Sequence, residues 1–238
     1  MSPPDLDPLL AHHRASTEEM SAEELERLRR DVVQATWDAP LTLRERLRRL
    51  PTPVRAAVVV VVACALLLGM DATIGLRDDL TAADRSRVYG SLVSVFALGT
   101  LALVIPLRGV YRPPLRPAVR LGLLALLGVP ILIGLVPTWW TGRDLSPQDL
   151  VQAHVACFLS GSVVAGVAAS VTLLLDRSAR IARWRVLAAS AGGGLASFAV
   201  LGFHCYVGGM VHLALAHGLQ GITIAGVLLL LTRRGSPS

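Results

Sequence analysis

Long apolar runs separated by short polar segments make up most of the chain. Six runs approach the roughly 20 apolar residues that a helix needs to cross about 30 Å of hydrocarbon. They are Val54–Met70, Tyr89–Leu107, Val119–Trp140, Val151–Leu175, Trp184–Phe203 and Gly209–Thr232. Because a helix satisfies its own backbone hydrogen bonds in lipid, the pattern predicts an all-α polytopic membrane protein built as a bundle of six transmembrane helices.

The composition agrees with a membrane protein. Of the 238 residues, 53% are hydrophobic, and the mean hydropathy of +0.57 exceeds what a soluble core of this size can bury. The first fifty residues are polar, so we expect no cleaved secretory signal at this end. The chain therefore divides into an N-terminal segment, residues 1–52, and a transmembrane domain, residues 53–238.

The arginines between the runs predict the orientation in the membrane, since positive residues in short loops stay on the cytoplasmic side. Arginines gather in the second connection, the fourth connection and the C-terminal tail: Arg108, Arg112, Arg116 and Arg120; Arg177, Arg180, Arg183 and Arg185; Arg233 and Arg234. We therefore expect both termini in the cytoplasm of a bacterium, with the helices in its inner membrane. This bias accounts for most of the net charge of +6, so direct binding to nucleic acid is not expected.

Histidines and cysteines gather at one end of the last three runs. His154 and Cys157 open the fourth run, His204 and Cys205 close the fifth, and His212 and His217 begin the sixth. Given the predicted orientation, all six face the extracytoplasmic side. Imidazole nitrogen and thiolate sulfur are the ligands of a zinc- or copper-like ion, and two thiols can also form a disulfide in an oxidising compartment.

One pair within this group conflicts with a simple metal site. On a regular helix His212 and His217 are about 140° apart, so a straight helix does not direct both toward one ion. We therefore expect one of the two to serve a different partner.

Small residues predict that the fourth and fifth helices touch. They recur at every fourth position, as Ser162, Gly166 and Ser170 in the fourth run and Ala188, Gly192 and Ala196 in the fifth, which lets two helix backbones approach closely. Such contact would hold Cys157 near Cys205.

In the third run, Pro130 and Pro137 are expected to kink or end the helix.

The N-terminal segment predicts two short amphipathic helices. Ser21 and Glu24 form a capping box ahead of Leu25, Leu28 and Val32, which lie on one stripe of a helix that ends before Pro40. The acidic residues beside this stripe disfavour lipid, so we expect it to bind a protein partner or the other helix.

The second amphipathic helix has the opposite charge. Thr42 and Glu45 repeat the capping pattern, an apolar stripe follows at Leu43, Leu47 and Leu50, and Pro51 ends the helix. Its arginine-rich face favours a position on the membrane surface beside acidic lipids.

The residues around the last histidines resemble a known family. The stretch Leu201-Gly202-Phe203-His204-Cys205, followed by Met210-Val211-His212 and Ala216-His217-Gly218, together with Cys157 upstream, is similar to the six-helix bacterial membrane anti-sigma factors of the NrsF type. The chain differs from that pattern at Tyr206, where the family tends to have proline, and at Ala216, where it tends to have tryptophan.

The resemblance implies a function. It suggests a negative regulator that sequesters an extracytoplasmic-function sigma factor at the inner membrane and releases it on an outside signal. In the family two cysteines take part in sensing, and the matching positions are Cys157 and Cys205. The N-terminal segment, with Leu25, Leu28 and Val32, would bind the sigma factor.

Other classes of membrane protein remain to be weighed. A haem- or metal-binding redox protein could use His154 with His212 or His217 as axial ligands, and a purely structural assembly subunit is a third possibility. The runs hold no acidic residue near mid-membrane, which argues against a transporter. They also hold no His-Glu-x-x-His pattern and no nucleophile beside a base, so no catalytic residue is assigned and no enzyme is expected.

Overall fold

The computed structural model describes residues 21–38, 42–108, 115–135, 145–176, 182–207 and 209–234. The described residues are almost entirely helical, as the sequence predicted. The chain separates into two compact units, Met1–Leu43 and Arg44–Ser238. Each unit is described by itself below.

The N-terminal unit holds one long helix, α2 (Ala22–Asp38). Its start confirms the capping box: the Glu24 backbone N–H donates to Ser21 Oγ at 3.3 Å, and the Ser21 N–H donates to Glu24 Oε2 at 2.9 Å. This backbone hydrogen bond, helped by one from the Ser21 hydroxyl, lowers the pKa of the Glu24 carboxyl. Leu25 and Leu28 are 45% and 53% exposed, and the side chain of Val32 lies outside the described residues.

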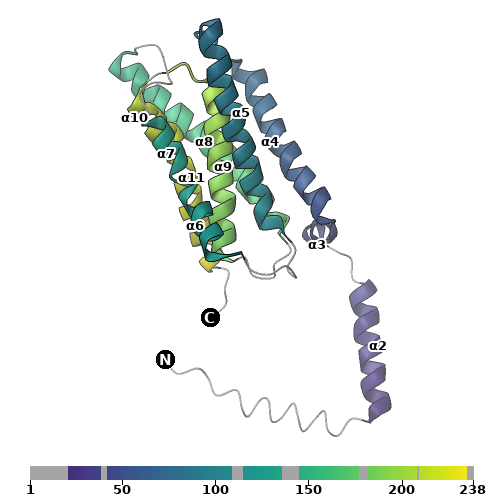
Figure 1. The fold of residues 1–238 in the computed structure, drawn as a ribbon. Coiled ribbons are helices and arrows are strands. Elements are labelled where there is room, and N and C mark those ends of the chain that lie inside the picture. The colour runs from purple at the N-terminus through teal and green to yellow at the C-terminus, as the bar shows by residue number, and fades with distance from the viewer. Residues whose placement is uncertain are drawn as a thin grey trace, which may run out of the picture. The chain divides into compact units, whose positions relative to one another are not determined.

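The second unit begins at Arg44, within α3 (Leu43–Arg49), and continues as a helical bundle (Figure 1). Five of its helices are long and apolar enough to span a membrane: Thr52–Ile74, Asp84–Leu107, Pro147–Leu174, Arg183–His204 and Met210–Thr232. They correspond to α4 (Thr52–Ile74), α5 (Ala82–Val104) with η1 (Ile105–Leu107), α8 (Pro147–Leu174), α9 (Arg183–His204), and the series α10 (Met210–His212), η2 (Leu213–His217) and α11 (Gln220–Arg234).

The third predicted span is not one continuous helix, so the expected count of six is corrected to five in the described part of the chain. It is split into α6 (Pro117–Ala125) and α7 (Val129–Gly134), with a turn between them. Pro130 lies in the first turn of α7, where its missing N–H is tolerated. The break predicted at Pro130 is thus confirmed, while Pro137 lies outside the described residues.

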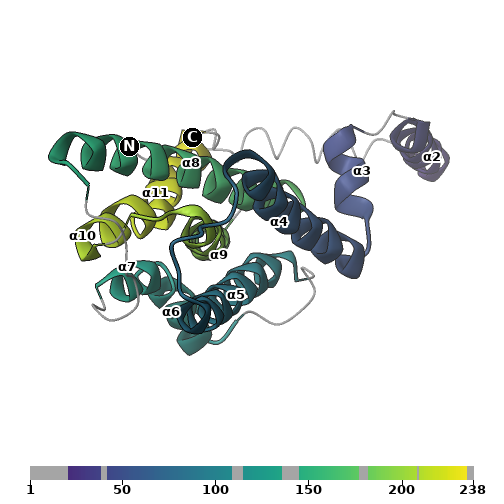
Figure 2. The same cartoon turned by 90° about the horizontal axis from the view of Figure 1, so that it is seen from above.

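Helix α9 is the centre of the bundle and lies between α8 and α5 (Figure 2). Nearly all of its residues are buried. A methyl group at Gly193 would lie 2.6 Å from the Ala165 carbonyl oxygen of α8, and one at Gly194 would lie 2.7 Å from the Gly221 Cα of α11. The close contact predicted between the fourth and fifth helices is therefore confirmed, but Gly193 and Ala165 make it. Gly192 and Ala196, which were predicted to face α8, meet Gly99 of α5 instead.

Two buried arginines join the helix ends at the end of the bundle where α4 and α9 begin. Arg55 donates to the carbonyl oxygens of Leu175 at 2.7 Å and Leu107 at 3.1 Å. Arg185 donates to the Pro106 carbonyl at 2.6 Å and forms an ion pair with Asp176. The last carbonyls of a helix have no partner within the helix and carry partial negative charge, so these arginines stabilise the C-terminal ends of α8 and η1.

Candidate metal and thiol site

The predicted histidines and cysteines lie at the other end of α8 and α9. Ser146 is the N-cap residue of α8: its Oγ accepts the Asp149 N–H at 3.3 Å, which stabilises the start of the helix. Its first turns present His154 and Cys157. Helix α9 ends at His204, and Cys205 follows it with its N–H donated to the Leu201 carbonyl at 2.7 Å.

A π-helical turn, η2, follows α10 and changes the relation between the last two histidines. The Gly218 N–H donates to the Leu213 carbonyl at 3.0 Å, five residues earlier. Because a π-turn closes over five residues rather than four, His212 and His217 come onto one face of the helix. Their ring centroids are 5.1 Å apart. The separation expected for a straight helix is therefore removed by the local fold.

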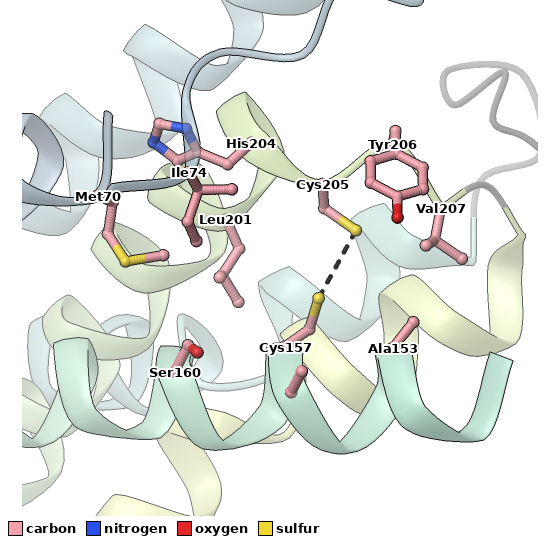
Figure 3. A pocket seen from close by; sticks show the side chains of 11 residues that line it. Met70, Ile74, Ala153, Cys157, Ser160, Leu201, His204, Cys205, Tyr206 and Val207 are labelled. Carbon is pink, nitrogen blue, oxygen red and sulfur yellow. Dashed lines mark hydrogen bonds between the residues drawn. The ribbon is translucent and has the colours of Figure 1, made fainter. Parts of the chain in front are cut away.

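Four side chains converge as a result: Cys157, Cys205, His212 and His217, called the Cys/His cluster below. One ligand atom of each can be chosen so that all four atoms lie within 4.8 Å of one another. The Sγ atoms of Cys157 and Cys205 are 3.7 Å apart (Figure 3), and Cys205 Sγ is 3.3 Å from His212 Nε2. The two cysteines are partly buried and the two histidines are fully enclosed.

His217 is the least satisfied member of the cluster. Its side chain has 0% exposure, and neither ring nitrogen forms a hydrogen bond of regular geometry with the described residues, although the Cys205 sulfur interacts with the ring. The Phe198 ring packs edge-on against it at 5.9 Å. Since a buried polar group without a hydrogen bond costs on the order of 1–3 kcal/mol, this imidazole is suited to a ligand that it can coordinate.

His154 contacts the cluster through His212. Its Nδ1 lies 2.8 Å from the Leu150 carbonyl oxygen and 3.2 Å from His212 Nδ1. A carbonyl only accepts, so we assign the proton of His154 to Nδ1. His212 Nδ1 is then an acceptor, and its Nε2–H is the donor toward Cys205. His154 thus fixes the orientation of His212.

The sulfur of Cys205 is the more acidic of the pair. The Cys157 S–H, followed by the His212 N–H, donates to it and lowers the pKa of the Cys205 thiol. Hydrogen bonds to a thiolate favour the charged form. Of the two cysteines, Cys205 is therefore the one whose thiolate form is favoured.

His204 points away from the cluster. Its Nδ1 donates to the Gly75 carbonyl at 2.7 Å, in the connection after α4. Together with Met70 and Ile74 of α4 it lines a cavity of about 180 Å³ whose other wall includes Cys157 and Cys205 (Figure 3). The cavity places the two sulfur atoms within reach of a small ligand from the α4 side.

Two buried polar residues beside the cluster, Gln220 and Ser197, were not predicted from the sequence. Gln220 is fully buried and donates to the carbonyls of Ala216 at 2.6 Å and Cys157 at 3.2 Å. Ser197 donates to Gln220 Oε1 at 2.6 Å and also lies 2.8 Å from the Gly161 carbonyl. These contacts join α8, α9 and α11. The available signal was an amide side chain inside an apolar run, which needs a partner in lipid.

Comparison of the chain with models of known protein families, with curated proteins and with solved structures finds no match. The function is therefore inferred from the residues of the chain itself.

Proposed function

We propose that the protein is a membrane-bound anti-sigma factor that senses a metal or thiol-oxidising signal at the Cys/His cluster. The observation that carries the proposal is the convergence of Cys157, Cys205, His212 and His217 within 4.8 Å at one end of a bundle of apolar helices. The N-terminal unit, with α2, offers the exposed side chains of Leu25 and Leu28 to a partner. The residues that resemble NrsF-type proteins include all four cluster members.

The proposed orientation puts the cluster on the extracytoplasmic side of a bacterial inner membrane and both termini in the cytoplasm. It rests on the arginines of the loops and the tail. Arg55 and Arg185 agree with it, because they lie at the end of the bundle opposite the cluster. Fusions of a periplasm-specific reporter to each terminus test it: an active reporter at the N-terminus would contradict the proposal.

The partner surface is proposed on α2. Leu25 and Leu28 are exposed apolar residues on one stripe of a helix that is otherwise rich in charged residues over its first half, and an amphipathic helix of this kind binds in an apolar groove of a partner. Val32 extends the stripe in the sequence. The chemistry of the partner, an extracytoplasmic-function sigma factor, comes from the family resemblance.

The proposed mechanism links the cluster to the partner surface through α8. A ligand shifts an equilibrium only if it binds one state better than the other. Binding or oxidation at Cys157 would change the packing of α8, and the far end of that helix accepts a hydrogen bond from Arg55 at Leu175. Arg55 lies in α4, which follows α3 and the N-terminal segment. A shift of α8 can therefore reach the segment that holds the sigma factor.

Co-purification tests the proposal. The full chain, tagged and extracted from membranes, is expressed with each extracytoplasmic-function sigma factor of the same genome. We expect one sigma factor to be retained by the wild-type chain and to be lost from the L25E/L28E variant. The control variant, Leu68→Ala on the exposed face of α4, should retain it. Retention of no sigma factor by the wild-type chain would refute the proposal.

The haem alternative is not favoured by the geometry. His154 and His212, one of the two pairs that could supply axial ligands, contact each other directly with ring centroids 4.4 Å apart, and His217 packs against His212 at 5.1 Å. A porphyrin would have to separate them. An absorption spectrum of the purified protein tests this class, because a Soret band would support it.

A further inference from the structure

We propose that the Cys/His cluster is a four-coordinate site for a tetrahedral metal ion of the zinc type, with Cys157 Sγ, Cys205 Sγ, His212 Nε2 and one ring nitrogen of His217 as its ligands. The inference deepens the proposed function, since it names the ligand set and the class of ion at the sensing site. It also assigns His154 to a positioning role and leaves His204 out.

The distances fit a tetrahedral ion. With a metal–sulfur bond of about 2.3 Å, two sulfur ligands of a regular tetrahedron are about 3.8 Å apart, and a sulfur and a nitrogen ligand are about 3.6 Å apart. The cluster has 3.7 Å between the two Sγ atoms and 3.3 Å between Cys205 Sγ and His212 Nε2. These two distances are close to those that a tetrahedral ion requires, and the four ligand atoms all lie within 4.8 Å of one another.

His217 is an independent sign of a ligand. It is completely buried, it is directed toward the other three side chains, and its ring nitrogens have no hydrogen bond of regular geometry among the described residues. The π-turn that directs it there replaces regular α-helical hydrogen bonds, and such turns occur frequently at functional sites. Coordination by a metal ion would satisfy the imidazole and stabilise the turn.

The donor set selects the kind of ion. Two thiolates with two imidazoles in a tetrahedral arrangement favour zinc, whereas calcium and magnesium take oxygen ligands. The described surroundings of the cluster supply no carboxylate ligand to it. Four protein ligands leave no open position, as in zinc sites that stabilise a fold rather than catalyse a reaction.

The contacts around the ligands match those of a metal site. Histidine ligands are usually oriented by a hydrogen bond from the other ring nitrogen. Metal binding at His212 Nε2 would move its proton to Nδ1, which lies 3.2 Å from His154 Nδ1 and could donate to it once the His154 proton is on Nε2. Gln220 holds the backbone carbonyls of Cys157 and Ala216, next to two of the ligands. His204 is engaged with Gly75 instead, so it serves as a matched control.

The test uses the purified full chain in detergent, with Zn²⁺ in competition with a chelator and Co²⁺ as a visible probe of coordination. We expect one ion per chain, intense tetrahedral Co²⁺ bands and a sulfur-to-cobalt charge-transfer band. His217→Ala should lower the Zn²⁺ affinity by more than about 100-fold, and His154→Ala by about 10–100-fold. Cys64→Ser should bind as the wild type does, and His204→Ala should lose much less affinity than His217→Ala because its ring is bonded to Gly75 and not directed at the ion.

His217→Cys separates a ligand from a residue needed only for packing. A thiolate at this position can replace the imidazole, so this variant should retain tetrahedral Co²⁺ bands with stronger charge transfer. Wild-type affinity in His217→Ala, or equal losses in His204→Ala, would overturn the ligand set.

The two proposals fail separately. A chain that retains its sigma factor and responds to oxidants but binds no Zn²⁺ or Co²⁺ would overturn the metal site and leave the anti-sigma function in place. A chain that binds Zn²⁺ through the four ligands but retains no sigma factor would uphold the metal site and refute the function.

Discussion

Cys205 Sγ lies 3.3 Å from His212 Nε2, seven residues later in the chain. The short connection between them reverses direction at Gly209, whose φ of +115° favours glycine. The end of α9 and the start of α10 thus form a local pair of ligands. Cys157 is added to it by α8, which packs closely on α9.

The first prediction concerns the acidity of Cys205. Its pKa is lowered by the hydrogen bond from Cys157, so the thiolate should persist as the pH falls below the usual range for a thiol. Cys157→Ala removes the donor, and we expect the alkylation of Cys205 to require a higher pH. The measurement is the pH profile of iodoacetamide labelling, read by mass spectrometry of the Cys205 peptide in a metal-free Cys64→Ala background. An unchanged profile in Cys157→Ala would contradict the assignment of that hydrogen bond.

A second prediction tests the π-turn. Leu215 is exposed within η2. Deleting it should convert η2 to α-helix and leave the two histidines four residues apart, still on one face. Inserting an alanine after Leu215 should instead rotate His217 away by about 100°. We expect Zn²⁺ binding to survive the deletion and to fall by more than about 100-fold with the insertion, a loss larger than that for a residue outside the ligand set. Equal binding by both variants would contradict this account of the turn.

The helices could be predicted from the sequence because each depends on local patterns. Apolar runs predicted five of the spans correctly and the third wrongly as one continuous helix. Ser21 and Glu24 predicted the start of α2, and small residues predicted the contact of α8 with α9. The height of Cys157 and Cys205 along their helices followed from the rise per residue. Their approach to each other followed from that contact, as the structure bears out.

The direction of the His217 side chain relative to that of His212 could not be predicted in the same way. The π-turn packs against α7, where Gly134 approaches Ala214, and no periodicity in the sequence records such a contact. The role of Gln220 depends likewise on carbonyls from two helices. The rotation of each helix about its axis, which decides between His154, His204 and His217 as ligands, is set by this tertiary packing.

A third prediction follows from the contact of α7 with η2. A methyl group at Gly134 would lie 2.7 Å from the Ala214 backbone nitrogen, so Gly134→Ala must displace one of the two segments. We expect a loss of Zn²⁺ affinity of about 10-fold or more, as for other changes beside a metal ligand, measured by chelator competition. Gly122→Ala in α6, where the added methyl meets nothing within 4 Å, is the matched control. Wild-type affinity in both variants would show that α7 does not support the turn.

The last prediction concerns the buried ion pair of Arg185 with Asp176 at the end of the bundle where α9 begins. Arg185→Met removes a cation that a buried carboxylate and the Pro106 carbonyl both contact. Breaking one side of a buried pair costs on the order of 3–5 kcal/mol, so we expect a lower free energy of unfolding in detergent. Arg183→Met, at an exposed position on the same turn, should change it little. The double variant R185M/D176L should regain much of the loss, because it leaves no uncompensated charge in the interior. If Arg185→Met were as stable as the wild type, this pair would not contribute to joining α8 and α9.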